Sequence, residues 1–112
     1  MGRIDEYRGK IRQILTRHAS YDTIPRGLDD QIITDTEHDH YLFIRTGWYD
    51  VERRSYGCLM HMDIINEKIW IQYDGTEEGV ANELVDLGVP KEDIVLAYHQ
   101  PDSRKWTDFA VR

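Results

Sequence analysis

The fold predicted for this chain follows first from two adjacent segments, RRSYGCLMHMDII at residues 53–65 and NEKIWIQ at residues 66–72. Residues alternate along the first stretch with the period of two that is typical of a β-strand. Asn66 readily adopts the positive φ of a tight turn, so the two stretches predict neighbouring antiparallel strands. The more apolar face is predicted to comprise Arg54, Tyr56, Cys58, Met60, Met62 and Ile64, and the other face Ser55, Gly57, Leu59, His61, Asp63 and Ile65.

Further strands are predicted on both sides of this hairpin. Residues 31–34 and 40–47 are rich in β-branched and aromatic residues, and the polar residues 36–39 between them predict a turn. Residues 94–98 read IVLAY, and this short apolar run predicts a buried strand.

Two helices are also predicted. In residues 4–18 the apolar positions recur with helical spacing, and acidic residues precede basic ones, as the helix dipole favours. The pattern ends at residues 21–27, where Pro25 favours extended backbone before it. After the strands, Thr76 is predicted to cap a second helix, and Gly88 is predicted to end it.

The order of these elements predicts the architecture. Consecutive strands joined by tight turns must run antiparallel, and the helices then cover one face of the sheet. We therefore predict an α+β fold, in which an antiparallel β-sheet meander packs against an N-terminal helix and a second helix in two layers. No repeat or linker divides the sequence, so residues 1–112 are expected to form a single domain. The irregular tail is expected to pack on the core or on a neighbouring subunit through Trp106, Phe109 and Val111.

The composition limits the classes of function open to the chain. Its 112 residues carry 14 basic and 21 acidic side chains, and the net charge of −7 disfavours tight direct binding to DNA. The single cysteine, Cys58, allows neither an internal disulfide nor a multi-cysteine zinc site. The apolar runs are far shorter than the about 20 residues of a membrane span, and the first residues lack a signal-peptide pattern. A cytoplasmic protein is therefore expected.

A set of short motifs extends over essentially the whole chain. It comprises Asp39-His40-Tyr41, Gly47-Trp48, Arg54-Ser55-Tyr56-Gly57-Cys58, His61-Met62-Asp63, Lys68-Ile69-Trp70-Ile71-Gln72, Glu83-Leu84-Val85 and the run from Gly88 to Leu96. In these motifs the sequence resembles the XisI family. It departs from the family pattern at Glu67, where glycine is common, and at Gln100, where a proline usually follows the histidine. Both departures fall in turns.

The resemblance implies a function as well as a fold. The XisI family is named for excision controlling factors of a nitrogen-fixation DNA element in cyanobacteria, which is removed during heterocyst differentiation. These factors act beside a site-specific recombinase and a companion protein called XisH. The resemblance therefore implies a non-enzymatic accessory protein with a XisH-like partner, which contacts DNA at most indirectly through a recombinase complex. Many family members occur apart from that element, so the resemblance alone assigns no particular excision event.

Histidine and acidic residues occur together in two places and leave open a metal-assisted nuclease or hydrolase. Residues 37–40 read EHDH, which fits either a solvated turn or a pair of metal ligands. His61 and Asp63 share one face of their strand, and a metal site there would need a third ligand such as His40 or His99. A hydrogen-bonded structural pair, or a pair in a subunit contact, is the interpretation we favour, so no metal or other cofactor is predicted.

Aromatic and guanidinium side chains gather near residue 50 and at the tail. Such groups are typical of protein interfaces and of base-stacking surfaces, and the negative net charge favours a protein partner. A direct DNA-binding module, or simple packing of these rings under the helices, remains the alternative. No catalytic residue is predicted, Cys58 is interpreted as a small buried hydrophobe, and a homodimer or larger homo-oligomer is expected. The predicted interface comprises Arg45, Trp48, Tyr49, Arg54, Tyr56, His61, Asp63, His99, Trp106 and Phe109.

Overall fold

Residues 54–65 and 68–74 form two strands of a five-stranded sheet in the computed structural model, which describes residues 2–21 and 26–112. Strand β3 (Arg54–Ile65) is followed after a two-residue turn by β4 (Lys68–Asp74). Asn66 and Glu67 both have positive φ, 52° and 63°, as the predicted hairpin requires, although glycine is preferred at the second corner. Of the predicted break at residues 21–27, residues 22–25 lie outside the described residues.

The sheet has the strand order β1-β2-β3-β4-β5. Strands β1 (Leu28–Asp35) and β2 (His40–Trp48) form the predicted antiparallel meander together with β3 and β4. Strand β5 (Ile94–Leu96) differs, because it pairs with β4 in parallel. The chain passes between these two strands through helix α2 (Val80–Asp86) and the short turn η1 (Lys91–Asp93), which return it to the same end of the sheet.

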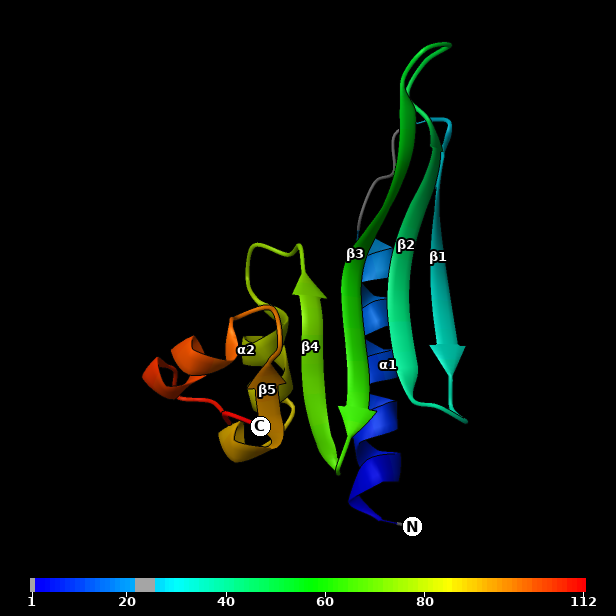
Figure 1. The fold of residues 1–112 in the computed structure, drawn as a ribbon. Coiled ribbons are helices and arrows are strands. Elements are labelled where there is room, and N and C mark those ends of the chain that lie inside the picture. Colours follow the sequence, from blue (N-terminus) through cyan, green and yellow to red (C-terminus); the bar gives the residue numbers. More distant parts are fainter. Residues whose placement is uncertain (1, 22–25) are drawn as a thin grey trace.

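The helices lie on one side of the sheet, as the two-layer prediction requires. Helix α1 (Arg3–Tyr21) runs behind β2 and β3 in Figure 1, and α2 lies beside β4 and β5. The tail, with its 3-10 helix η2 (Pro101–Trp106), lies at the β5 edge. Within residues 2–21 and 26–112, no helix covers the opposite face of β1, β2 and β3, which we call the open face.

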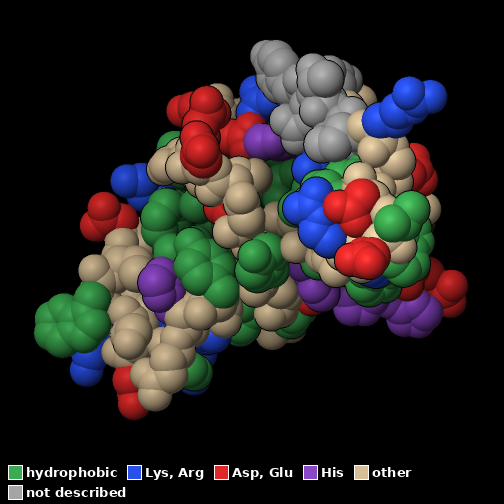
Figure 2. Space-filling view, turned by 90° about the horizontal axis from the view of Figure 1, so that it is seen from above, with side chains coloured by type: hydrophobic (Ala, Val, Ile, Leu, Met, Phe, Trp, Pro, Cys, Tyr) green, Lys and Arg blue, Asp and Glu red, His purple; other side chains and the backbone are tan. Residues whose placement is uncertain are grey.

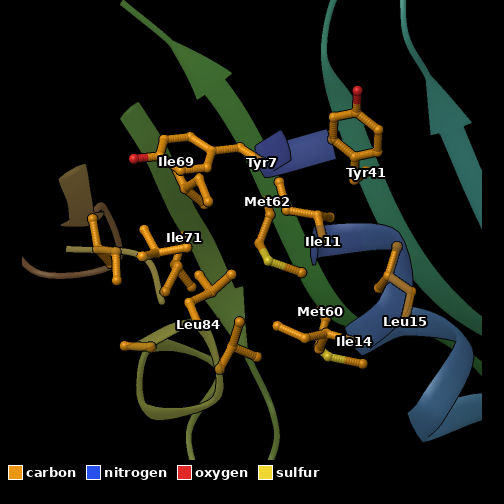
Figure 3. Packing of buried hydrophobic residues seen from close by; sticks show 14 of the residues in the cluster. Tyr7, Ile11, Ile14, Leu15, Tyr41, Met60, Met62, Ile69, Ile71 and Leu84 are labelled. Atoms are coloured by element: carbon orange, nitrogen blue, oxygen red, sulfur yellow. The ribbon is translucent and has the colours of Figure 1, made fainter. Parts of the chain in front are cut away.

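A hydrophobic cluster fills the space between helices and sheet (Figure 3). Ile11, Ile14 and Leu15 have no exposed surface, because their spacing of three and four places them on the sheet-facing side of α1. Burying such a side chain stabilises the fold by about 1.5–3 kcal/mol. The sheet and α2 contribute Tyr41, Phe43, Met60, Met62, Ile69, Ile71, Val80 and Leu84.

Tyr7 joins the cluster with a buried ring and a polar tip. Only 2% of the residue is exposed, and its hydroxyl donates a hydrogen bond to the carboxylate of Asp93, which is itself 7% exposed. Burial raises the pKa of the Tyr7 hydroxyl well above its usual value, and the hydrogen bond to Asp93 raises it further. The folded state therefore holds the proton of Tyr7 more tightly than the unfolded chain does.

This difference predicts a loss of stability at alkaline pH. Because the folded pKa of Tyr7 is raised, its contribution is fully present below about pH 10 and is lost above it, by at most about 1.4 kcal/mol per pH unit. Thermal unfolding measured between about pH 8 and pH 12 checks this expectation. Tyr7→Phe should reduce the alkaline slope, whereas Tyr56→Phe, at a residue that is 71% exposed, should keep it. Equal slopes in the two variants would contradict the prediction.

A bulge interrupts the alternation of β3. In the pairing with β2, Phe43 lies opposite Met60 and Ile44 lies opposite Cys58, which leaves Leu59 as an extra residue. Two residues of one strand then oppose one residue of its neighbour. Both Leu59 and Met60 pack with the core on the helix side of the sheet.

The bulge corrects the faces predicted for β3. The prediction that Tyr56 and Cys58 share a face with Met60 was wrong, because the extra residue reverses the alternation before it. Tyr56 lies opposite Thr46 and belongs with Cys58 to the open face. These two side chains therefore share a face with His61.

Helix α2 begins later than predicted, so the assignment of Thr76 as its cap was wrong. The residue before the helix is Gly79. The carboxylate of Asp74 accepts the Val80 amide at 2.7 Å and the Thr76 hydroxyl at 2.6 Å, so it takes the capping role from outside the helix. The predicted end is confirmed, since Gly88 has φ of 98° and its amide donates back into the last turn at 2.9 Å.

Candidate functional site

Two histidines and one aspartate meet on the open face, and we call them the His-Asp cluster. Strand pairing sets His40 opposite Asp63, and His61 lies two residues before Asp63 on the same face. His40 Nδ1 lies 2.8 Å from Asp63 Oδ1, and His61 Nε2 lies 2.9 Å from the same oxygen. One ligand atom from each residue lies within 4.8 Å of the others. Figure 2 shows histidine side chains beside acidic ones along one edge of the molecule.

The carboxylate of Asp63 is also held from its other side. Gln72 Nε2 donates to Asp63 Oδ2 at 3.3 Å, and Asp63 is 6% exposed. The sequence-based prediction did not include Gln72. The pKa of His40 is raised above its usual value. The larger cause is its hydrogen bond to Asp63, and the second cause is the negative charge of Asp63. Chemically, the arrangement suits either a carboxylate that orients two imidazoles or a set of metal ligands.

The run EHDH at residues 37–40 does not act as one cluster. His38 Nδ1 lies 3.0 Å from a carboxylate oxygen of Asp35 in an exposed turn. Asp39 instead accepts a hydrogen bond from Arg8 Nε at 2.8 Å, and this contact holds the pKa of Asp39 below its usual value. Of this run, only its last residue belongs to the His-Asp cluster.

The β2–β3 hairpin ends in exposed rings, and residues 48–56 are called the hairpin tip. Figure 1 shows the tip projecting well beyond α1. Trp48 is 50% exposed, Tyr49 48% and Tyr56 71%. The guanidinium carbon of Arg54 lies 5.5 Å from the Trp48 ring centroid, within the range of a cation–π contact. These predicted interface residues therefore do not pack under the helices.

Apolar side chains connect the His-Asp cluster with the hairpin tip. Leu42 pairs with His61, Ile44 pairs with Cys58, and Ile33 of β1, which is 45% exposed, pairs with Leu42. The open face thus has an apolar centre, a polar cluster towards one end and aromatic rings at the other. Burial raises the pKa of the partly buried Cys58 thiol, which favours the protonated form over a nucleophilic thiolate.

Arg45 differs from the other predicted interface residues, because it lies on the helix side of the sheet. Its Nε and one terminal nitrogen donate to the two carboxylate oxygens of Asp30 at 2.6 and 2.9 Å, and the Asp30 side chain is 4% exposed. Arg45 also lines a pocket between α1, α2 and the sheet, together with Arg17, His18 and Glu83. Arg17 and His18 both contact the Glu83 carboxylate. The sequence did not reveal this pocket, because its residues come from separate elements.

The predicted interface residues of the tail have different environments. The ring of His99 contacts that of Tyr98 at a tilt of 39°, with centroids 4.7 Å apart, and His99 lies outside the His-Asp cluster. Phe109 is partly buried against the core, as predicted. Trp106 is 81% exposed, so it does not pack on the core.

The fold and the site define a small α+β protein whose sheet is covered by helices on one face and bears exposed rings on the other. No described helix is long and apolar enough to cross a membrane. The chain belongs to the XisI family. Its residues 1–111 match the family model described as XisI protein.

Solved structures from Anabaena variabilis share this fold. A XisI-like protein is 39% identical, with a TM-score of 0.92 over 97% of this chain and 99% of its own. The fdxN element excision controlling factor XisI is 31% identical, with a TM-score of 0.86 over 99% of this chain and 100% of its own. No curated protein sequence matches the chain. The family resemblance and the α+β architecture predicted from the sequence are thus confirmed.

Proposed function

We propose that this chain is a non-enzymatic accessory factor for the excision of a DNA element, and that it acts in the cytoplasm by binding a XisH-like companion protein. In this proposal the chain contacts DNA at most indirectly, through a recombinase complex. Membership of the XisI family supports the proposal, as does the name excision controlling factor carried by a structure that is 31% identical. The observation that carries it is the ring-rich hairpin tip beside the open face.

The proposed partner surface runs from the His-Asp cluster across Leu42 and Ile44 to the hairpin tip. Tyrosine, tryptophan and arginine side chains are enriched among the residues that dominate protein interfaces, and the tip presents all three. An apolar centre with polar groups at its edge also matches the usual anatomy of such interfaces. The net charge of −7 opposes direct binding to a polyanion, which favours a protein as the occupant.

Trp48→Ser and Tyr56→Ser are each expected to weaken binding to the XisH-like companion by about tenfold or more. Dominant interface rings contribute about 2 kcal/mol or more, and 1.4 kcal/mol corresponds to a factor of ten. Both side chains are at least half exposed, so the melting temperature should change little. Calorimetric titration of the purified companion into each variant measures the affinity, and thermal unfolding measures the stability.

Tyr98→Ser is the matched control, because Tyr98 is 48% exposed but follows β5, two strands away from the hairpin. It should bind the companion like the wild type. Equal weakening by Tyr98→Ser, or wild-type proteins that stay apart at micromolar concentration, would contradict the proposal. Light scattering of the chain alone provides a further test. If the wild type is a homodimer and Trp48→Ser and Tyr56→Ser are monomers, the surface binds a second copy of the chain instead of the companion.

A further inference from the structure

We propose that His40, His61 and Asp63 bind one divalent transition-metal ion, for which Zn²⁺ is the appropriate probe. The ligand atoms are His40 Nδ1, His61 Nε2 and Asp63 Oδ1. Imidazole nitrogen and carboxylate oxygen are ligands that zinc accepts readily, and three protein ligands leave a fourth position for water.

The backbone of the sheet, rather than a loop, brings these ligands together. His40 begins β2 and lies directly opposite Asp63 of β3, while the period of two along β3 turns His61 to the same face. Sites built on paired strands hold their side chains more precisely than sites on loops. The cluster is therefore formed before any ion binds.

The distances are close to those that a metal site requires. Zinc binds imidazole nitrogen and carboxylate oxygen at about 2.0–2.2 Å, which places tetrahedral ligand atoms about 3.4 Å apart. His40 Nδ1 and His61 Nε2 lie 2.8 and 2.9 Å from Asp63 Oδ1, and all three ligand atoms lie within 4.8 Å of one another, so side-chain rotations that widen the two short distances make room for the ion. Without an ion, His40 Nδ1 and His61 Nε2 both hydrogen-bond to Asp63 Oδ1. When the ion binds, it takes the place of the protons in these two hydrogen bonds. Each neutral imidazole then carries its proton on the other ring nitrogen.

The surroundings favour a cation and give it access. Gln72 holds Asp63 Oδ2 and thus keeps Oδ1 directed at the two imidazoles, which is the role of an outer-shell partner in metal sites. The side chain of His40 is 51% exposed and that of His61 31%, while that of Asp63 is 9% exposed. An ion can therefore enter from solvent and meet an oriented, poorly hydrated carboxylate. The negative charge of Asp35 also acts on His40.

The competing explanation is a hydrogen-bonded cluster that needs no ion, and direct titration separates the two. The full chain without an affinity tag is freed of metal with a chelator and titrated with ZnCl₂ by calorimetry. We expect one ion per chain and a melting temperature that rises with zinc concentration by mass action. CoCl₂ should give the visible absorption of a four-coordinate cobalt ion. Absence of one-to-one binding would overturn the proposal.

Variants locate the site. His61→Gln should weaken zinc binding by at least about 100-fold, and Gln72→Ala by about tenfold, because loss of an outer partner costs about 10–100-fold and loss of a ligand costs more. If His61→Gln fails to fold, as judged by circular dichroism, His40→Gln at the half-exposed position replaces it. The matched control is His38→Gln, which removes an imidazole that lies 3.0 Å from Asp35 and outside the cluster. Unchanged affinity in the ligand variants, or equal loss in His38→Gln, would overturn the assignment.

Discussion

The Gly47→Ala variant is expected to lose about 3 kcal/mol or more of unfolding free energy. Gly47 has φ of 134°, a conformation that residues with a Cβ atom rarely adopt. A Cβ atom at this position would overlap the carbonyl oxygen of Gly27 and lie 2.9 Å from the Cα of Leu28. Both obstacles are backbone atoms at the point where β1 and β2 meet, so no side chain can rotate away to relieve the contact.

Gly57→Ala is the matched control for this prediction. Gly57 lies on β3 opposite Arg45, and a Cβ atom there meets no heavy atom within 4 Å. Its effect should stay within about 1 kcal/mol. Thermal unfolding distinguishes the two variants, because 3 kcal/mol corresponds to a fall of about 12 °C in melting temperature for a domain of this size. A Gly47→Ala protein that melts within a few degrees of the wild type would contradict the close approach of the two strands.

The features of the fold that could be predicted from the sequence are those set by local chemistry. The β3–β4 turn follows from the backbone preference of Asn66, and the end of α2 follows from Gly88. The bulge at Leu59 could not be predicted, because the pairing with β2 decides where an extra residue is accommodated. The start of α2 was misplaced for a similar reason, since the carboxylate of Asp74 competes with the local capping residue.

The candidate site was predictable to the same degree. That His61 and Asp63 share a face follows from the period of a strand. That His40 rather than His99 joins them depends on the register between β2 and β3, which the sequence leaves open. Gln72 was missed because its position beside Asp63 depends on the register between β3 and β4, in which Asp63 lies opposite Trp70.

The Arg45→Ala variant is expected to lose about 3 kcal/mol of unfolding free energy. The guanidinium of Arg45 donates two parallel hydrogen bonds to Asp30, whose side chain is 4% exposed. Its removal leaves a buried carboxylate without this partner, and that penalty exceeds the loss of the hydrogen bonds themselves. Urea unfolding measures the difference. Arg45→Lys should recover only part of it, because an ammonium group cannot reproduce the planar two-bond contact.

The exposed pair of Arg53 with Asp50 provides the control, because its Nε–Oδ2 distance is 2.7 Å but the Arg53 side chain is 70% exposed. Arg53→Ala should change stability by less than about 1 kcal/mol. Adding Asp30→Asn to Arg45→Ala removes the uncompensated charge and should recover about 1 kcal/mol or more.

The same variants separate folding from partner binding. Arg45 lies on the helix side of the sheet, so Arg45→Ala protein that remains folded at low temperature should bind the XisH-like companion as the wild type does. Trp48→Ser should show the reverse, with stability kept and binding weakened, because its ring is half exposed at the hairpin tip. An Arg45→Ala protein with unchanged stability and lost binding would instead place Arg45 in the interface, where the sequence alone predicted it.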